Sequence, residues 1–114
     1  MNDAYVLNVA DEFSPRPFGR YRSDGERSAE EFREKHLIPA MSQHEHVTVD
    51  LSGTNYYGSS FLEETFGGLV RAIRTRKVLD ITEDDLNARL KIVHEKLPSI
   101  EEEAKQYIQE AWKA

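Results

Sequence analysis

The feature that most constrains this fold is a change of hydrophobic period within residues 47–76. From Val47 to Leu51 apolar residues alternate with polar ones, which is the period-two pattern of a β-strand. From Phe61 to Ile73 the apolar residues recur every three or four positions, which predicts an amphipathic helix. A strand joined to a helix by one polar loop is the repeating unit of α/β domains, so we predict that class of fold.

The loop between this strand and helix, residues 52–60, brings two adjacent serines to the helix start. Unpaired backbone N–H groups and the helix dipole favour negative charge there, so such a serine either caps the helix or carries a phosphate. Ser60 and Glu63 have the spacing of a capping box, in which each side chain bonds the other residue's backbone N–H. We therefore predict that Ser60 is the N-cap. Ser59 falls one position outside the helix, which leaves its hydroxyl available to solvent or a partner.

Two adjacent glycines, Gly67 and Gly68, lie inside the predicted helix. Together they cost about 2 kcal/mol of helix propensity relative to alanine. Close packing of another backbone against the helix would justify that cost. The helical spacing predicts a partner over Gly67, on the polar side, and the sheet beneath Gly68.

Three further segments have strand-like patterns. Residues 4–9 and 90–94 alternate and predict a first and a last strand, and residues 18–22 are compatible with a second strand antiparallel to the first. Because helices intervene, the strand at residues 47–51 is expected to be central and parallel to at least one neighbour. We predict a small mixed sheet of about four to five strands.

Capping patterns predict the remaining helices. Ser28 precedes a helix that starts at Ala29 and that Pro39 should kink or end near Ile38. Residues 82–90 predict a short helix. From Ser99 onward, an amphipathic C-terminal helix is expected to pack on the sheet, with docking on a partner as the alternative.

The composition limits the classes of function. The chain has 114 residues, enough for a single domain spanning residues 1–114, and it contains no cysteine, which excludes thiolate chemistry and favours a reducing cytoplasm. The net charge of −6 argues against binding to nucleic acid, because a surface that follows phosphates needs clustered cations. No apolar run is long enough for a membrane span, so we expect no membrane partner.

No pattern in the sequence predicts catalysis. Nucleophile-elbow, Walker and dinucleotide-binding motifs are all missing, so we expect no enzymatic activity and no cofactor. His44 and His46 could point to one side of a strand and share a metal ion. A third protein ligand is not evident, however, and a solvated loop without metal is the better interpretation.

Two stretches of sequence carry a resemblance to a known family. They are VDLSGTNYYGSSFLEETFGGLVR, residues 49–71, and FGRYRSDGERSAEEFREKHLIPAM, residues 18–41. Both resemble the STAS-like family of unknown function and, more distantly, STAS domains such as the bacterial anti-sigma factor antagonists. The resemblance agrees with a small α/β fold, and it implies a non-enzymatic regulatory module that binds other proteins.

By position, the resemblance makes Ser59 the candidate phosphoacceptor, with Gly58 where the antagonists carry an acidic residue. It implies a kinase-like ATPase or a switch protein as partner. The alternative is a sensor that binds a small anion or nucleotide at the same helix N-terminus, assisted by Arg20 or Arg22. The predicted partner or anion surface comprises Tyr56, Tyr57, Gly58, Glu64, Gly67, Arg20 and Arg22.

Overall fold

Three parallel strands form the sheet of the computed structural model, which describes residues 3–54, 58–76 and 78–114. They are β1 (Ala4–Asn8), β2 (His46–Asp50) and β3 (Leu90–Val93), with β2 in the centre. The α/β class and the central parallel strand are therefore confirmed. The mixed sheet of four to five strands is not, because both pairings among the described residues are parallel.

The segment expected to form an antiparallel strand, residues 18–22, is a loop that leads into a 3₁₀ turn, η1 (Arg22–Asp24). Asp24 explains the difference. Its Oδ2 accepts hydrogen bonds from the backbone N–H groups of Arg20 at 3.1 Å and Tyr21 at 3.0 Å. Backbone donors that a strand would use for pairing are thus bound by a local side chain, which favours a turn.

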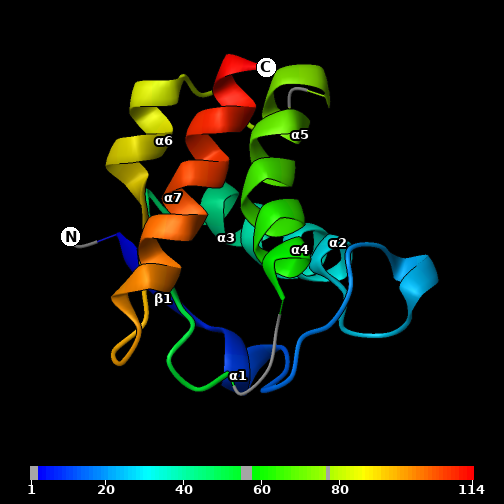
Figure 1. The fold of residues 1–114 in the computed structure, drawn as a ribbon. Helices are drawn as coiled ribbons and strands as arrows, with labels where there is room; N and C mark the ends of the chain where they lie inside the picture. The colour runs from blue at the N-terminus through cyan, green and yellow to red at the C-terminus, as the bar shows by residue number, and fades with distance from the viewer. Residues whose placement is uncertain (1–2, 55–57, 77) are drawn as a thin grey trace.

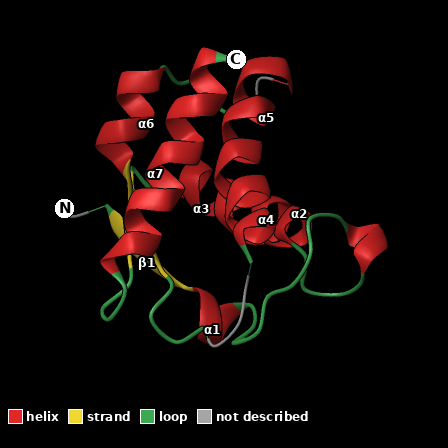
Figure 2. Cartoon of the chain, viewed as in Figure 1, coloured by secondary structure: helices red, strands yellow, loops and turns green. Residues whose placement is uncertain are grey.

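Helices connect the parallel strands and lie on one face of the sheet (Figures 1 and 2). The connection from β1 to β2 contains α1 (Val9–Glu12), α2 (Ala29–Phe32), η2 (Arg33–Leu37) and α3 (Ile38–Gln43). The connection from β2 to β3 contains α4 (Ser59–Leu62), η3 (Glu63–Gly67), α5 (Gly68–Arg76) and α6 (Glu83–Arg89), and α7 (Pro98–Lys113) follows β3. Both connections step in the same direction, so their common right-handedness puts them on the same side.

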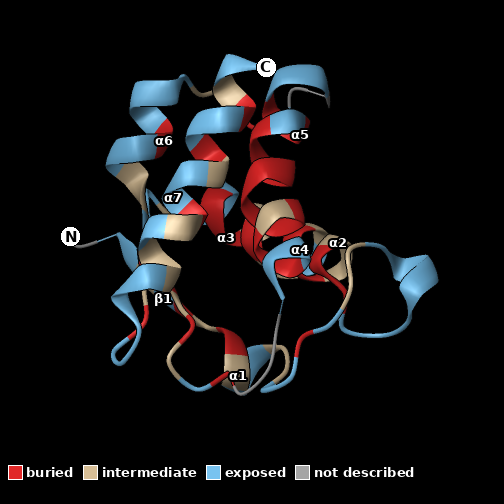
Figure 3. Cartoon of the chain, in the orientation of Figure 1, coloured by how far each residue is buried: buried red, intermediate tan, exposed pale blue. Residues whose placement is uncertain are grey.

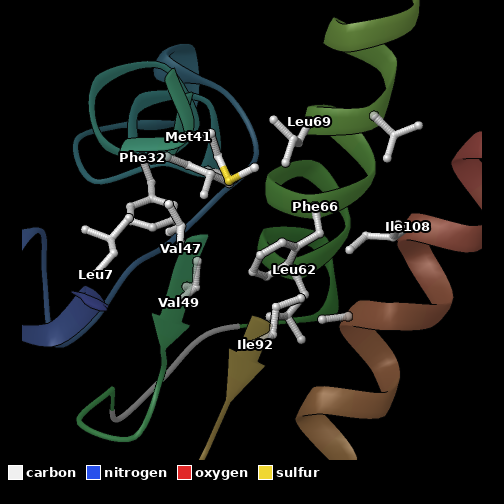
Figure 4. Close-up of a cluster of buried hydrophobic side chains, with 14 of the residues drawn as sticks. Leu7, Phe32, Met41, Val47, Val49, Leu62, Phe66, Leu69, Ile92 and Ile108 are labelled. Carbon is white, nitrogen blue, oxygen red and sulfur yellow. The ribbon is translucent and has the colours of Figure 1, made fainter. Parts of the chain in front are cut away.

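The strand register separates a buried face of the sheet from an exposed one. Leu7, Val49 and Ile92 are aligned across the three strands and are all buried. On the opposite face Val6 is 58% exposed, and Lys91, in the same row across the sheet, is also exposed. The core lies between the buried face and the helices (Figures 3 and 4). Its largest fully buried side chains include Phe32, Phe61, Phe66, Leu37, Met41, Leu62 and Leu69.

Each of the two long helical runs contains a π-helical turn, η2 in residues 29–43 and η3 in residues 59–76. Pro39 accounts for the first. In an α-helix its ring would clash with a carbonyl in the preceding turn, whereas here the Ile38 N–H bonds the carbonyl of Arg33, five residues back. The run continues to Gln43, so the helix does not end near Ile38. Of the two predicted effects of Pro39, a kink or an end, the interruption of regular winding at η2 corresponds to the first.

The predicted caps have different outcomes. Ser28 does accept a hydrogen bond from the Glu31 N–H at 3.2 Å, and Thr82 caps the short helix α6. At the last helix the prediction is wrong, because α7 begins at Pro98, one residue before the expected cap. Proline is well suited to a first helical turn, where its missing N–H would have had no partner. No helix among the described residues has the length and apolar character needed to cross a bilayer.

Candidate functional site at the start of the central helix

The central helix begins at Ser59, after Gly58 in an extended conformation with φ −101° and ψ 172°. The Phe61 N–H donates to the Gly58 carbonyl at 3.0 Å, and no side chain caps this helix end. Ser59 and Ser60 are its first two residues, and both are exposed. The prediction of Ser60 as N-cap is therefore wrong, as is the position of Ser59 outside the helix.

Glu63 shows why the capping box does not form. Its Oε1 accepts a hydrogen bond from Arg20 Nη1 at 2.6 Å, and its Oε2 accepts one from Arg71 Nη1 at 2.6 Å. The hydrogen bond from Arg71 and then that from Arg20 hold the pKa of the Glu63 carboxyl below its usual value, and the same bonds raise the pKa of both arginines. Each of these bonds joins two ionised groups, whereas the cap bond that they replace would join the carboxylate to an uncharged backbone N–H.

Glu64 forms a buried ion pair with Arg33. Arg33 Nη1 donates to the Glu64 carboxylate at 2.8 Å and to the Glu64 backbone carbonyl at 2.7 Å. The two residues are only 5% and 6% exposed, respectively. Glu64 was predicted on the partner surface, and its burial shows that this is wrong. We call Arg20, Arg33, Glu63, Glu64 and Arg71 together the arginine–glutamate network.

The paired glycines make room for this network. A Cβ at Gly67 would lie 2.6 Å from Glu63 Oε2, and a Cβ at Gly68 would overlap Arg33 Nη1. Both glycines are buried. The atoms that a Cβ would meet belong to side chains of the chain's own ion pairs and not to another backbone. The helix is closely packed here, but the predicted approach of another backbone, the partner over Gly67 and the sheet beneath Gly68 are wrong.

The two π-helical turns meet at the network. Arg33 is the first residue of η2, and Glu63 and Glu64 are the first two residues of η3. The buried ion pair therefore joins the two irregular turns directly. Such turns inside α-helices are frequently found at functional sites, which adds weight to this region as the candidate site.

Ser59 is exposed but has a neighbour on α7. The Tyr107 hydroxyl donates to Glu103 Oε2 at 2.7 Å, and this bond raises the pKa of Tyr107. A hydrogen bond with the Ser59 hydroxyl acts on that pKa in the opposite direction. A negative charge added at Ser59 would therefore meet the carboxylate of Glu103 as well as the helix N-terminus.

The two arginines of the predicted surface are both engaged in ion pairs. Arg22 Nη2 donates to Glu34 Oε1 at 3.1 Å, so both Arg20 and Arg22 already pair with carboxylates. Both guanidinium groups that were expected to assist an anion at the helix start are thus engaged by carboxylates. Tyr56 and Tyr57 lie outside the described residues.

Sequence reasoning missed Arg33 and Arg71. Arg71 could have been found, since it lies two helical turns after Glu63 on the same side of a helix. Arg33 could not, because its partner is 31 residues away in the sequence. The glycine pair was the one available sign that something packs closely there.

The fold and the site together define a small STAS-like α/β domain, with exposed serines at the start of the helix after the central strand. A family model described as a STAS-like domain of unknown function (DUF4325) matches residues 28–99, and the chain belongs to this family. The resemblance drawn from residues 18–41 and 49–71 is thereby confirmed. Comparisons with curated proteins and with solved structures gave no significant match.

Proposed function

We propose that the domain is a non-enzymatic regulatory module that binds a protein partner through the surface around Gly58, Ser59 and Ser60. The observation that carries this proposal is the exposure of both serines in the first turn of the central helix. A kinase-like ATPase or switch protein is the partner by analogy with the anti-sigma factor antagonists. The antagonists are bacterial, and such an ATPase needs the nucleotide of the cell interior. The proposal therefore also places the module in the cytoplasm of a bacterium.

The charge state of the network supports a role without catalysis. A general base works best with a pKa near the working pH. The pKa of Glu63 is instead lowered by its two arginines, which makes its carboxylate a weaker base. Glu64 is buried behind Arg33 and is likewise engaged. These carboxylates are better suited to fixing the helix than to moving protons.

Ser59 is the proposed switch residue. Phosphorylation would add a charge of about −1.5 to −2 beside the helix N-terminus, where backbone N–H groups tolerate it. The same charge would face Glu103 and change the surface that a partner covers. We therefore expect phosphorylation to preserve the fold and to weaken partner binding.

The test begins with co-purification from the native cell and identification of partners by mass spectrometry. Binding of the recovered partner is then measured for the parent, Ser59→Ala and Ser59→Asp. We expect Ser59→Asp to bind about 5- to 150-fold more weakly, as for couplings of 1–3 kcal/mol, with an unchanged unfolding midpoint. Aspartate imitates only part of the phosphate charge, so the lower end of that range would also count in favour.

Ser99→Asp is the matched control, because Ser99 is an exposed serine in the first turn of α7. It makes the same chemical change at another helix start, and its partner affinity should equal that of the parent. Equal affinity of the parent, Ser59→Ala and Ser59→Asp would refute the switch. Equal losses in Ser59→Asp and Ser99→Asp would show a non-specific charge effect instead.

A further inference from the structure

β1 forms one edge of the sheet, and part of its backbone is unpaired along that edge. The Asp3 carbonyl accepts a hydrogen bond from the His46 N–H at 3.0 Å, so the odd-numbered residues of this segment direct their backbone groups toward β2. Ala4 and Val6 therefore direct theirs outward. None of the described residues is a hydrogen-bond partner for these outward N–H and C=O groups. Four backbone groups are thus available to an added strand.

The opposite edge strand, β3, is already closed at both ends. The Leu90 N–H donates to a carbonyl in α6, and the His94 N–H, just after the strand, donates to Glu101 Oε2 at 3.2 Å. Lys91 adds an exposed charge to β3, and such charges commonly protect sheet edges from added strands. β1 has no charged residue, and its Val6 side chain is exposed. Of the two edges, β1 is therefore the one open to another strand.

A groove beside β1 provides space for side chains of an added strand. Its volume is about 230 Å³, and its lining includes Tyr5 and Leu7 of β1 and Pro39 and Ala40 of α3. Side chains alternate between the two faces of a sheet, so every second side chain of an added strand would lie at this groove. The others would lie beside Val6 on the open face, where an apolar neighbour covers its exposed surface.

The start of β1 lies in acidic surroundings. Asp3, Glu45 and Asp85 line a cleft at this end, together with Arg89. Three carboxylates therefore face one guanidinium group among the described residues of this cleft.

The end of β1 is acidic as well. Asp11 and Glu12 follow the strand in α1, and the segment from Asp3 to Glu12 contains no lysine or arginine. Lys35 lines the groove, but its ammonium lies 3.9 Å from the Glu31 carboxylate, which opposes its charge. An added strand therefore meets negative charge at both of its ends.

We propose that the free edge of β1 binds an extended basic segment of a partner protein, which joins the sheet as a fourth strand. The backbone groups of Ala4 and Val6 bond this segment, and its lysine or arginine residues face the carboxylates at the two ends of β1. A second copy of this chain is the poorer occupant. Antiparallel pairing along β1 would bring Asp3 of one copy toward Asp11 and Glu12 of the other, and like charges opposite one another are destabilising.

The probe is a synthetic peptide with blocked ends, Lys-Val-Thr-Val-Thr-Val-Lys, and its charge control carries glutamate in place of both lysines. Basic residues at both ends suit either direction of pairing. Binding is followed by NMR shifts and by hydrogen exchange of the Val6 amide. We expect the basic peptide to bind at least about five-fold more tightly than the acidic one. We also expect it to slow Val6 exchange at least about ten-fold, because that N–H gains an acceptor.

Two variants at Val6 separate edge pairing from other contacts. Val6→Pro removes the outward N–H without removing a bond to β2, and proline is tolerated on edge strands for this reason. It should abolish peptide binding. Val6→Thr is the matched control, because it keeps the N–H and the branched side chain, and it should bind within about two-fold of the parent.

Asp11→Lys tests the charge independently of the Val6 variants. The Asp11 side chain is exposed, so its replacement leaves the core unchanged. It should weaken binding of the basic peptide about two- to five-fold and strengthen binding of the acidic one by a similar factor. Unfolding midpoints establish that each variant is folded.

Four results would overturn the proposal. They are no binding of the basic peptide at millimolar concentration, equal binding of the two peptides, binding that leaves Val6 exchange unchanged, and unchanged binding by folded Val6→Pro. Protection of the Val6 amide that rises with protein concentration in the absence of peptide would assign the edge to a second copy instead. None of these results bears on Ser59, because the assay uses no native partner and the variants leave residues 58–60 unchanged.

Discussion

At the scale of single residues, Gly67 and Gly68 show how the same residue type can meet different neighbours at adjacent positions. Replacing either glycine by alanine gains about 1 kcal/mol of helix propensity. The added Cβ at Gly67 meets the ends of Glu63 and Arg71, whose side chains are 26% and 46% exposed and can shift. At Gly68 it meets the guanidinium of Arg33, which is fixed in the buried pair.

We therefore predict that Gly68→Ala destabilises the domain and Gly67→Ala does not. The free energy of unfolding of Gly67→Ala should lie within about 1 kcal/mol of the parent, since propensity offsets the shift of two surface side chains. Gly68→Ala should lose about 2 kcal/mol or more, because a buried ion pair must move. Urea unfolding measures both. Equal stability of the two variants would show that the pair over Gly68 is not fixed.

A second residue-scale prediction compares adjacent glutamates. Glu64→Gln removes one charge of a buried pair and leaves Arg33 uncompensated, which should cost about 3–5 kcal/mol. Glu63→Gln removes a charge nearer the surface and should cost about 1 kcal/mol or less. Denaturant unfolding at neutral pH measures the difference. The argument for a structural role of the buried pair fails if Glu64→Gln is as mild as Glu63→Gln.

At the scale of elements, two arginines donate hydrogen bonds to the backbone carbonyls at the end of a helix to which they do not belong. Arg89, the last residue of α6, donates to the carbonyls of Met41 at 2.5 Å, His44 at 2.9 Å and Glu45 at 2.7 Å, at the end of α3. Arg74 of α5 likewise donates to three carbonyls at the end of α7, those of Ala111, Trp112 and Ala114. These bonds satisfy carbonyls that a helix end leaves unpaired.

We predict that Arg89→Met destabilises the domain by about 2 kcal/mol, because it removes charge-assisted bonds to backbone carbonyls and keeps much of the side-chain volume. The destabilisation should affect the end of α3 before it affects other helices. Hydrogen exchange of residues 38–43 should accelerate more than that of α7. Lys105→Met is the control, since this lysine is exposed and its contact with Glu102 is 4.0 Å long. Uniform acceleration across both helices would contradict a local clamp.

Individual helices and strands also show what sequence patterns could and could not predict. The period change at residues 47–76 correctly predicted β2 and its helix, because burial of one face imposes that period. The serine–glutamate spacing failed at Ser60 because Glu63 has stronger partners from Arg20, 43 residues away, and from Arg71. The spacing at Thr82 succeeded because Asp85 bonds back to its N–H. A local pattern holds only where no distant charge competes for its side chain.

The candidate site also has a part that local sequence predicts and a part that depends on distant residues. The two serines near the helix start were predictable from residues 58–68 alone, although the cap assigned to Ser60 was wrong, and the glycine pair indicated close packing without identifying the side chains that pack there. The network was not, because Arg20 and Arg33 reach it from segments whose position depends on the whole fold. The loop of residues 18–22 is the clearest case: its strand-like pattern was overridden by Asp24 and by the contact of Arg20 with Glu63.

At the scale of the whole molecule, carboxylates with lowered pKa link stability to pH. The pKa of Glu63 is lowered by Arg71 and Arg20, and those of Asp3 and Asp85 by backbone hydrogen bonds from Glu45 and Thr82, respectively. A carboxyl whose pKa is lower in the folded state stabilises the fold above its unfolded pKa. That contribution is lost as the pH falls through the folded pKa.

We predict that the free energy of unfolding decreases as the pH falls below about 4.5, the region in which an unfolded glutamate gains its proton. Glu63→Gln should show a smaller decrease than the parent, because one of the responsible groups is gone. Urea unfolding at a series of pH values between about 6 and 3 measures this difference. Parallel curves for the two proteins would mean that Glu63 does not contribute to acid sensitivity.

The π-helical turn at residues 63–67 also determines where this helix could lose a residue. Relative to a continuous α-helix, such a turn contains one additional residue. Deleting one residue there would restore regular winding and keep the later side chains on the same side of the helix, so Leu69, Val70 and Ile73 would stay in the core. In a regular part of the helix, the same deletion would rotate every later side chain by about 100° around the helix axis. A one-residue deletion is therefore better tolerated within this turn than after it.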